Sequence, residues 1–128
     1  MKALLDTHTL LWAVIHPEFL SRRASEIIND NANVILVSAA SAWEIATKVR
    51  NRKLPGAEAF EREFLHTLRD VGYEILSIDA ETALRAARFA GEHRDPFDRM
   101  IAAQAIALDI PVISKDPRFD VFGVRRIW

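Results

Sequence analysis

The chain has 128 residues, of which 50% are hydrophobic, and its formal net charge is −1. This length and composition predict one domain, residues 1–128, and exclude a disordered chain, while the near-neutral charge excludes a uniformly basic nucleic-acid binder. The absence of cysteine excludes a disulfide framework, a thiolate metal site and a thiol nucleophile.

Short apolar runs alternate with longer segments of helical periodicity along the chain. In order, the pattern predicts a strand at residues 3–5, helices at 7–15 and 22–29, a strand at 34–37, helices at 38–52 and 57–71, a strand at 74–78, helices at 80–91 and from 96 to before 111, and strands at 112–113 and 124–127. This alternation predicts a parallel sheet with helices on both of its faces.

Several residues mark where these helices begin, end and face the core. Ser21 and Asp95 are expected N-caps, Pro96 takes a first helical position, and Gly72 is expected to end a helix. Three helices carry apolar stripes that we expect to be buried: Ala42, Ile45, Ala46 and Val49; Phe60, Phe64, Leu65 and Leu68; and Phe97, Ile101, Ala105 and Leu108.

No segment of the sequence predicts a membrane anchor. No run approaches the roughly 18 apolar residues needed to cross a bilayer. The apolar stretch before Asp6 is too short for the core of a signal peptide. We therefore expect a cytoplasmic protein that does not contact a membrane.

Four carboxylates from separate segments could meet at the carboxyl edge of the predicted sheet. Asp6 follows the first strand directly, and Asp116 comes three residues after Ile113, just past the fourth strand. Asp98 lies in the first turn of the helix that leads into the fourth strand, and Glu44 lies on the helix that leaves the second strand. In open parallel sheets, ligands bind outside the carboxyl ends of the strands, so chemistry is expected at this edge.

Such a cluster of like charges is costly unless a cation occupies it. Two unit charges about 4 Å apart repel by about 4 kcal/mol at an effective dielectric constant near 20. All-oxygen ligands suit hard divalent cations such as Mg²⁺ or Mn²⁺. A cation held there can activate a water and neutralise charge on a phosphodiester.

Each carboxylate also has a purely structural interpretation. The three aspartates stand where carboxylates commonly cap a helix, favour its dipole or start a turn. Glu44 follows Ser41 at the spacing of a capping box and precedes Lys48 at the spacing of a surface ion pair. Spacing alone leaves both interpretations open.

Four segments around these carboxylates closely resemble the motifs of PIN-domain toxins of the VapC type. They are residues 4–12 (LLDTHTLLW), 38–46 (SAASAWEIA), 93–105 (HRDPFDRMIAAQA) and 113–119 (ISKDPRF). They occur in the order that the family has and together span residues 4–119, nearly the whole chain. The combination of all four makes the resemblance specific.

The resemblance implies a fold, an activity and partners. The implied fold is a three-layer α/β/α sandwich with a central parallel sheet. The implied activity is that of a Mg²⁺- or Mn²⁺-dependent endoribonuclease, the toxin of a toxin–antitoxin pair, which forms a homodimer and is held inactive by its antitoxin. We expect a metal-activated water to attack phosphorus in line, without a covalent enzyme intermediate, and the resemblance implies products with a 5′-phosphate and a 3′-hydroxyl.

The resemblance also assigns roles to individual residues of this chain. The carboxylates that match the catalytic metal ligands of the family are Asp6, Glu44, Asp98 and Asp116. Ser114 stands where a Ser or Thr often supports the site, and Thr7 is expected to help through its hydroxyl or amide group. Asp95 is an extra acid in this motif, which we interpret as a supporting or capping residue.

Basic, histidine and tryptophan side chains lie close to these carboxylates in the sequence. The candidates for binding RNA phosphates are Arg94, Arg99, Lys115 and Arg118, with Lys48, in a basic run at a helix end, ranked below them. We interpret His8 and His93 as structural, because a four-carboxylate site needs no histidine. Trp12 and Trp43 are expected to pack in the core or in a dimer interface.

Two other functions are compatible with the predicted sheet. One is a catalytically silent PIN-like module that only binds RNA or a partner, although all four carboxylates are intact. The other is a phospho-receiver domain, which would need paired acids after the first strand and an aspartate after the third. Residues 5–7 (LDT) and 76–78 (LSI) supply neither, and the sequence also has no glycine-rich phosphate loop.

Overall fold

The strand β1 (Lys2–Leu5) lies at the centre of a five-stranded sheet in the computed structural model, which describes residues 1–128. The strand order is β3-β2-β1-β4-β5, and all neighbours are parallel. The other strands are β2 (Val34–Ser38), β3 (Glu74–Leu76), β4 (Val112–Ile113) and β5 (Arg126–Ile127). Leu5 pairs with Val37 on one side and with Ile113 on the other, so the residues that follow these three strands emerge at one edge.

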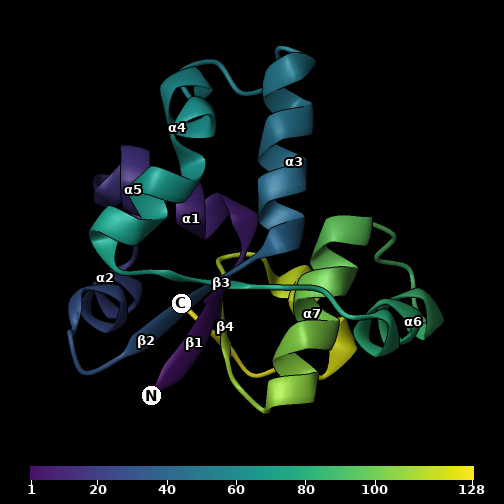
Figure 1. Cartoon of the computed structure of the whole chain (residues 1–128). Coiled ribbons are helices and arrows are strands. Elements are labelled where there is room, and N and C mark those ends of the chain that lie inside the picture. Colours follow the sequence, from purple (N-terminus) through teal and green to yellow (C-terminus); the bar gives the residue numbers. More distant parts are fainter.

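Helices fill the connections between the strands and cover both faces of the sheet. The α-helices are α1 (Thr7–Ile15), α2 (Arg22–Asn29), α3 (Ala39–Arg50), α4 (Glu58–Arg62), α5 (Phe64–Val71), α6 (Ala80–Arg88) and α7 (Pro96–Leu108), and the 3₁₀ helices are η1 (Pro17–Phe19) and η2 (Pro117–Phe122). Figure 1 shows α1 to α5 on one side of the sheet and α6 and α7 on the other. No helix has both the length and the apolar character that a membrane span requires.

Side chains of the central strand point alternately into two hydrophobic cores, as the pleat of a strand dictates. Ala3 and Leu5 are fully buried in a cluster that collects apolar side chains from α1 to α5. Leu4, between them in the sequence, is fully buried in a second cluster formed with α7 and η2. The two cores confirm the predicted three-layer sandwich around a parallel sheet.

Most predicted helix boundaries are confirmed. The first helix spans Thr7–Ile15, and Ser21 caps the second by accepting a hydrogen bond from the amide of Ala24. Asp95 caps α7, which begins at Pro96. Gly72 ends α5 in the left-handed conformation, with φ at 80°, which glycine adopts without steric cost.

The prediction of one continuous helix at 57–71 is wrong, and so is part of the apolar stripe predicted to be buried. The chain breaks the helix at Glu63, so that α4 and α5 are separate. Leu65 is 62% exposed, because α5 packs through Phe64 and Leu68 alone. A periodic stripe predicts a helix but does not show where its axis changes direction.

Other boundaries and stripes also need correction. β3 ends at Leu76, α6 ends at Arg88 and β5 has two residues, so each element is shorter than predicted. Ala46 is exposed because α3 buries the neighbouring face with Glu44 and Ile45. Leu108 is exposed because it lies in the last turn of α7, beyond the stretch that packs on the sheet.

Candidate active site

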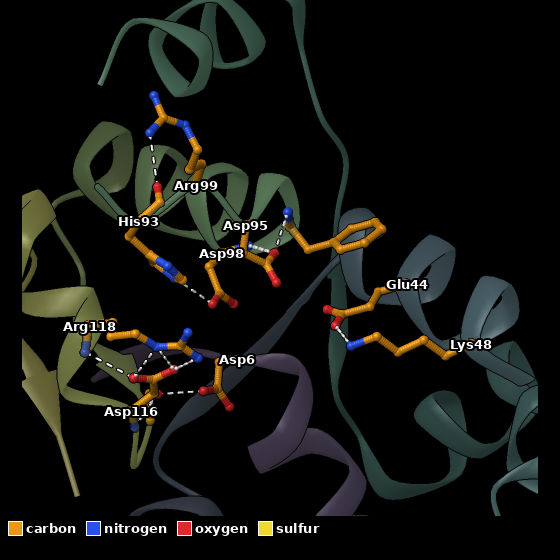
Figure 2. A network of polar contacts seen from close by, with 11 residues as sticks. Asp6, Glu44, Lys48, His93, Asp95, Asp98, Arg99, Asp116 and Arg118 are labelled. Carbon is orange, nitrogen blue, oxygen red and sulfur yellow. Dashed lines mark hydrogen bonds and ion pairs between the residues drawn. The ribbon is translucent and has the colours of Figure 1, made fainter. Parts of the chain in front are cut away.

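A cavity of about 450 Å³ lies at the carboxyl edge of the sheet, beside the ends of β1 and β4. Its lining residues are Asp6, Thr7, His8, Trp12, Glu44, Lys48, Asp95, Asp98, Lys115, Asp116, Pro117 and Arg118. All four predicted carboxylates are among them, together with Asp95. In Figure 2, Asp6, Asp98 and Asp116 face a common space that Glu44 approaches from α3.

Asp6 is fixed at the end of β1 by hydrogen bonds to both of its carboxylate oxygens. Its Oδ1 accepts from the amide of Thr9 at 2.7 Å, which caps α1, and its Oδ2 accepts from the hydroxyl of Ser114. The side chain is buried, and this burial raises the pKa of Asp6 although both hydrogen bonds act against the rise. Asp6 is therefore a helix cap and a cavity carboxylate at the same time.

Two aspartates stand at the start of α7 and have different surroundings. Asp95 accepts hydrogen bonds from the amides of Phe97 and Asp98, which makes it the N-cap of the helix. Asp98 is paired with His93, with 2.8 Å between its Oδ2 and Nε2 of the imidazole. Burial, and then the charge of Asp95, raises the pKa of Asp98 to about 6, and the charge of Asp6 adds to the rise.

Glu44 reaches the cavity from the buried face of α3. Its Oε2 lies 2.5 Å from Nζ of Lys48, while its Oε1 is buried without any hydrogen-bond partner. The ion pair predicted from the spacing is thus present, although Glu44 is buried and the pair does not lie on the surface as predicted. The predicted capping box is wrong, because Ser38 caps α3, and Ser41 lies inside the helix with its hydroxyl 2.9 Å from that of Thr7.

Asp116 is the N-cap of η2 and forms an ion pair with Arg118. Its Oδ1 accepts from the amide of Arg118 at 2.9 Å, and the guanidinium group donates to both carboxylate oxygens at 2.7 to 3.1 Å. The hydrogen bond from Arg118 lowers the pKa of Asp116. Ser114 links the backbone at Asp116 to the carboxylate of Asp6, because its hydroxyl accepts from the amide of Asp116 and donates to Asp6.

The donor set of the cavity fits a hard divalent cation in its chemistry, although not yet in its arrangement. All the acidic ligands offer oxygen atoms, and the unpartnered Oε1 of Glu44 is a buried acceptor that a cation would satisfy. As the side chains stand, however, no group of three or more His, Asp or Glu residues is arranged to hold a metal ion. Partners within the chain hold the carboxylates instead: Lys48, His93, Arg118 and Ser114.

The predicted phosphate-binding residues divide into two groups. Lys48, Lys115 and Arg118 line the cavity. Arg94 is exposed and does not line it. Arg99 points away from the cavity (Figure 2), and its guanidinium group donates to four backbone carbonyl oxygens at 2.5 to 3.3 Å. Those bonds use four of its five N–H donors and hold the guanidinium group away from the cavity, so Arg99 is not placed to bind RNA phosphate at this site.

Two aromatic features differ from what the sequence predicts. His93 contacts a site carboxylate directly, and its position five residues before Asp98 follows no helical or strand period that could have revealed the contact. Trp43 is 64% exposed with its ring edge-on to Phe97 at 5.0 Å between centroids, so packing in the core is wrong for this residue. Trp12 lines the cavity, 6.0 Å from Nζ of Lys115.

Comparison with known sequences relates the chain to a family. Residues 3–124 match the family described as the PIN domain. Ribonuclease VapC22 of Mycobacterium tuberculosis is 30% identical over 118 residues, which are 90% of this chain and 87% of that protein. Ribonuclease VapC16 of the same organism is 42% identical over 76 residues, but the match spans 56% of this chain and about half, 54%, of that protein.

Solved structures share the fold at low sequence identity. VapBC2 from Rickettsia felis, solved bound to a DNA fragment from its promoter, aligns with a TM-score of 0.69 at 17% identity, covering 99% of this chain and 98% of that one. VapC20 of Mycobacterium tuberculosis, described as a sarcin-ricin loop cleaving toxin, aligns with a TM-score of 0.66 at 16% identity and covers 95% of both chains. FitAcB from Neisseria gonorrhoeae aligns with a TM-score of 0.64 at 19% identity, covering 98% of this chain and 96% of that one.

Proposed function

The chain belongs to the PIN-domain family, and from this premise we propose that it is a metal-dependent endoribonuclease, the toxin of a toxin–antitoxin pair. The observation that carries the proposal is one cavity lined by four carboxylates from distant parts of the chain: Asp6, Glu44, Asp98 and Asp116. Two ribonucleases are among the relatives of the chain, which supports hydrolysis of RNA rather than a purely structural role for the cavity.

Mg²⁺ or Mn²⁺ is the proposed cofactor, held by those four carboxylates. Such an ion lowers the pKa of water and offsets negative charge on a phosphodiester. The chain supplies the geometry: Thr9 and Ser114 hold Asp6 by hydrogen bonds, and the backbone of α7 holds Asp98 at the edge of the cavity. The ion would replace the pairing of Lys48 with Glu44 and of Arg118 with Asp116.

Release of Lys48 and Arg118 from these ion pairs would also provide cations that can bind RNA. Lys48 and Arg118, once released from the carboxylates, would stand with Lys115 as three cations around the cavity. Phosphate groups on either side of the scissile bond would be held by these cations. Thr7 and Asp95 support the site from its wall, since the hydroxyl of Thr7 contacts α3 and Asp95 caps α7.

The partners of the chain are proposed by analogy with its neighbours in structure. Those include VapBC2 and FitAB, solved with DNA fragments. We propose that this chain also forms a complex with a cognate antitoxin protein, that it forms a homodimer and that it acts in the cytoplasm. Co-expression with the product of an adjacent gene for a small DNA-binding protein, followed by co-purification, tests the first of these partners.

The decisive experiment is an RNase assay on total RNA with Mn²⁺ or with EDTA, comparing the wild type with Asp6→Asn. Asparagine can still accept from the amide of Thr9 and can donate its NH2 to the hydroxyl of Ser114, so the fold should survive while cleavage is lost. Asp70→Asn, on the exposed face of α5, is the matched control and should cleave like the wild type.

Two results would count against the proposal. Cleavage by Asp6→Asn at a rate near that of the wild type would exclude the carboxylate site. Binding of RNA without cleavage, in Mn²⁺ and by the wild type, would favour the silent RNA-binding module instead. The internal ion pairs that cover Glu44 and Asp116 are the observation that gives this second function some support.

A further inference from the structure

The segment between α6 and α7 carries a buried histidine, His93, that contacts a carboxylate of the site without lining the cavity. The side chain of His93 is 6% exposed, and its Nε2 lies 2.8 Å from Oδ2 of Asp98. His93 does not line the cavity, whereas Asp98 does. In Figure 2 the imidazole stands on the far side of Asp98 from Glu44. The hydrogen bond of the histidine therefore reaches the lining of the cavity through this aspartate.

The imidazole ring is held in place by aromatic packing. Its centroid lies 5.5 Å from that of Phe122 and 6.4 Å from that of Phe119, both in η2. Phe119 and Phe122 are themselves buried in the core on the α7 side of the sheet. A ring packed against two buried rings has little rotational freedom, so the direction in which Nε2 points is fixed by the core.

The chemistry of the pair determines which atom donates. An ionised carboxylate only accepts hydrogen bonds, so His93 must carry the proton on Nε2 when Asp98 is charged. This bond is the only hydrogen bond made by the Asp98 side chain, and it uses Oδ2. The second oxygen, Oδ1, remains available as a ligand. A carboxylate anchored through one oxygen presents the other in a defined direction, as outer hydrogen bonds do in metal sites generally.

The backbone around His93 is fixed by Arg99, the residue that follows Asp98. Arg99 donates to the carbonyl oxygens of Ala86, Ala87 and Phe89 and, through Nη1 at 3.1 Å, to that of His93. The first two carbonyls belong to the last turn of α6. One guanidinium group on α7 thus ties down the segment that carries the histidine.

We propose that His93 is a positioning residue, whose Nε2–H holds Oδ2 of Asp98 so that Oδ1 is directed toward a divalent cation in the cavity. Arg99 acts one step further out, by holding the segment that carries the histidine. This inference rests on the proposed function, because it assigns His93 a role in the same metal site. A histidine that merely fills space between Phe119 and Phe122 would be replaceable by any apolar side chain of similar size.

Direct binding of Mn²⁺, measured by isothermal titration calorimetry on the full chain, tests the inference without relying on activity. His93→Gln keeps an N–H donor close to the position of Nε2, whereas His93→Leu keeps the packing and removes the donor. We expect His93→Leu to weaken Mn²⁺ binding by about 10- to 100-fold, and His93→Gln to stay within about threefold of the wild type. His66→Leu, on the exposed face of α5, is the matched control and should bind like the wild type.

Two further measurements separate positioning from folding. Arg99→Lys cannot reach four carbonyl groups and should weaken Mn²⁺ binding in the same direction as His93→Leu, while Arg85→Lys, exposed on α6, should not. In the RNase assay, a large excess of Mn²⁺ should restore most of the cleavage rate of His93→Leu, because the lost property is the affinity for the cation. Because excess Mn²⁺ also favours the folded state by mass action, metal-free His93→Leu must in addition show the circular dichroism spectrum of the wild type; a spectrum of an unfolded chain would assign the loss to folding.

The measured Mn²⁺ affinities distinguish failure of the positioning role from failure of the proposed function. Equal Mn²⁺ affinity of the wild type and His93→Leu would overturn the positioning role while leaving the proposed function intact. Absence of Mn²⁺ binding by the wild type would overturn the proposed function and this inference with it. If His93→Leu does not fold, His93→Asn replaces it: asparagine is polar but too short to place a donor near Asp98, so an affinity equal to that of His93→Gln would overturn the inference.

Discussion

Asp98→Asn should stabilise the metal-free protein although it removes the function. In the folded chain the pKa of Asp98 rises from 3.8 to about 6, first because of burial and then because of the charge of Asp95. A difference of one pKa unit corresponds to about 1.36 kcal/mol. Keeping Asp98 ionised at pH 7.5 therefore costs the folded state about 3 kcal/mol relative to the unfolded chain. Asparagine avoids this cost, and its Oδ1 can still accept from His93.

Thermal unfolding in EDTA measures this gain. For a chain of this length, 1 kcal/mol corresponds to roughly 4 °C in Tm, so Asp98→Asn should melt about 12 °C above the wild type at pH 7.5. The gain has a definite pH dependence. A group whose pKa is raised by folding stabilises the folded state fully below its ordinary pKa and loses this effect as the pH rises through the raised value. The advantage of the variant should therefore shrink as the pH falls through 6 and vanish below about 3.8.

Mn²⁺ should reverse the order of the two proteins. A cation at about 1,000 times its Kd stabilises the folded state by about 4.1 kcal/mol, which exceeds the advantage of about 3 kcal/mol that the variant has in EDTA, and only the wild type should gain this. Asp70→Asn, an exposed control on α5, should melt like the wild type in both conditions. A Tm of Asp98→Asn equal to or below that of the wild type in EDTA would refute the argument that the buried charge is unfavourable without a cation.

Three other outcomes are expected. Ser114→Ala should lower RNase activity by about 10- to 100-fold in Mn²⁺, because Asp6 loses the hydroxyl that orients it; unchanged rates would show that the hydroxyl is dispensable. Lys48→Met should lower the free energy of unfolding in EDTA by about 1 to 3 kcal/mol, measured by urea titration, since Glu44 is then buried without its partner. A stability equal to that of the wild type would show that the ion pair between Lys48 and Glu44 does not stabilise the protein. In EDTA the wild type should gain stability as the pH falls from 7 toward 5, because burial raises the pKa of Asp6 and Asp98. Below about pH 3.8 it should lose stability again, because the hydrogen bond from Arg118 lowers the pKa of Asp116; a Tm that falls steadily between pH 7 and 5 would contradict these assignments.

The helix and strand pattern was largely predictable because local sequence carries the boundaries. Asp6, Ser21 and Asp95 bind the free amides of the turns that follow them, and these interactions join residues two or three positions apart. Where the prediction is wrong, the cause lies further away in the chain. Leu65 and Leu108 fit the period of their helices and yet are exposed, because neither helix has a packing partner on that side.

The candidate carboxylates were predictable as a set, and their surroundings were not. Parallel strands deliver the residues after β1 and β4 to one edge, so Asp6 and Asp116 share the cavity by topology. The hydrogen bonds of Arg99 to backbone carbonyls could not be predicted, because the sequence does not show whether a guanidinium group is free or bound within the chain.

By itself, the sequence determined the layered α/β architecture, the order of the strands and helices along the chain, and the four acidic positions that end up at one edge. Those features follow from periodicity, caps and motif spacing, which act over a few residues. Only the tertiary structure decided which partner each charge has: Lys48 on Glu44, Arg118 on Asp116 and His93 on Asp98. Electrostatic pairing and burial depend on distances in space, and the aromatic core that aims the imidazole of His93 exists only once η2 has packed against α7.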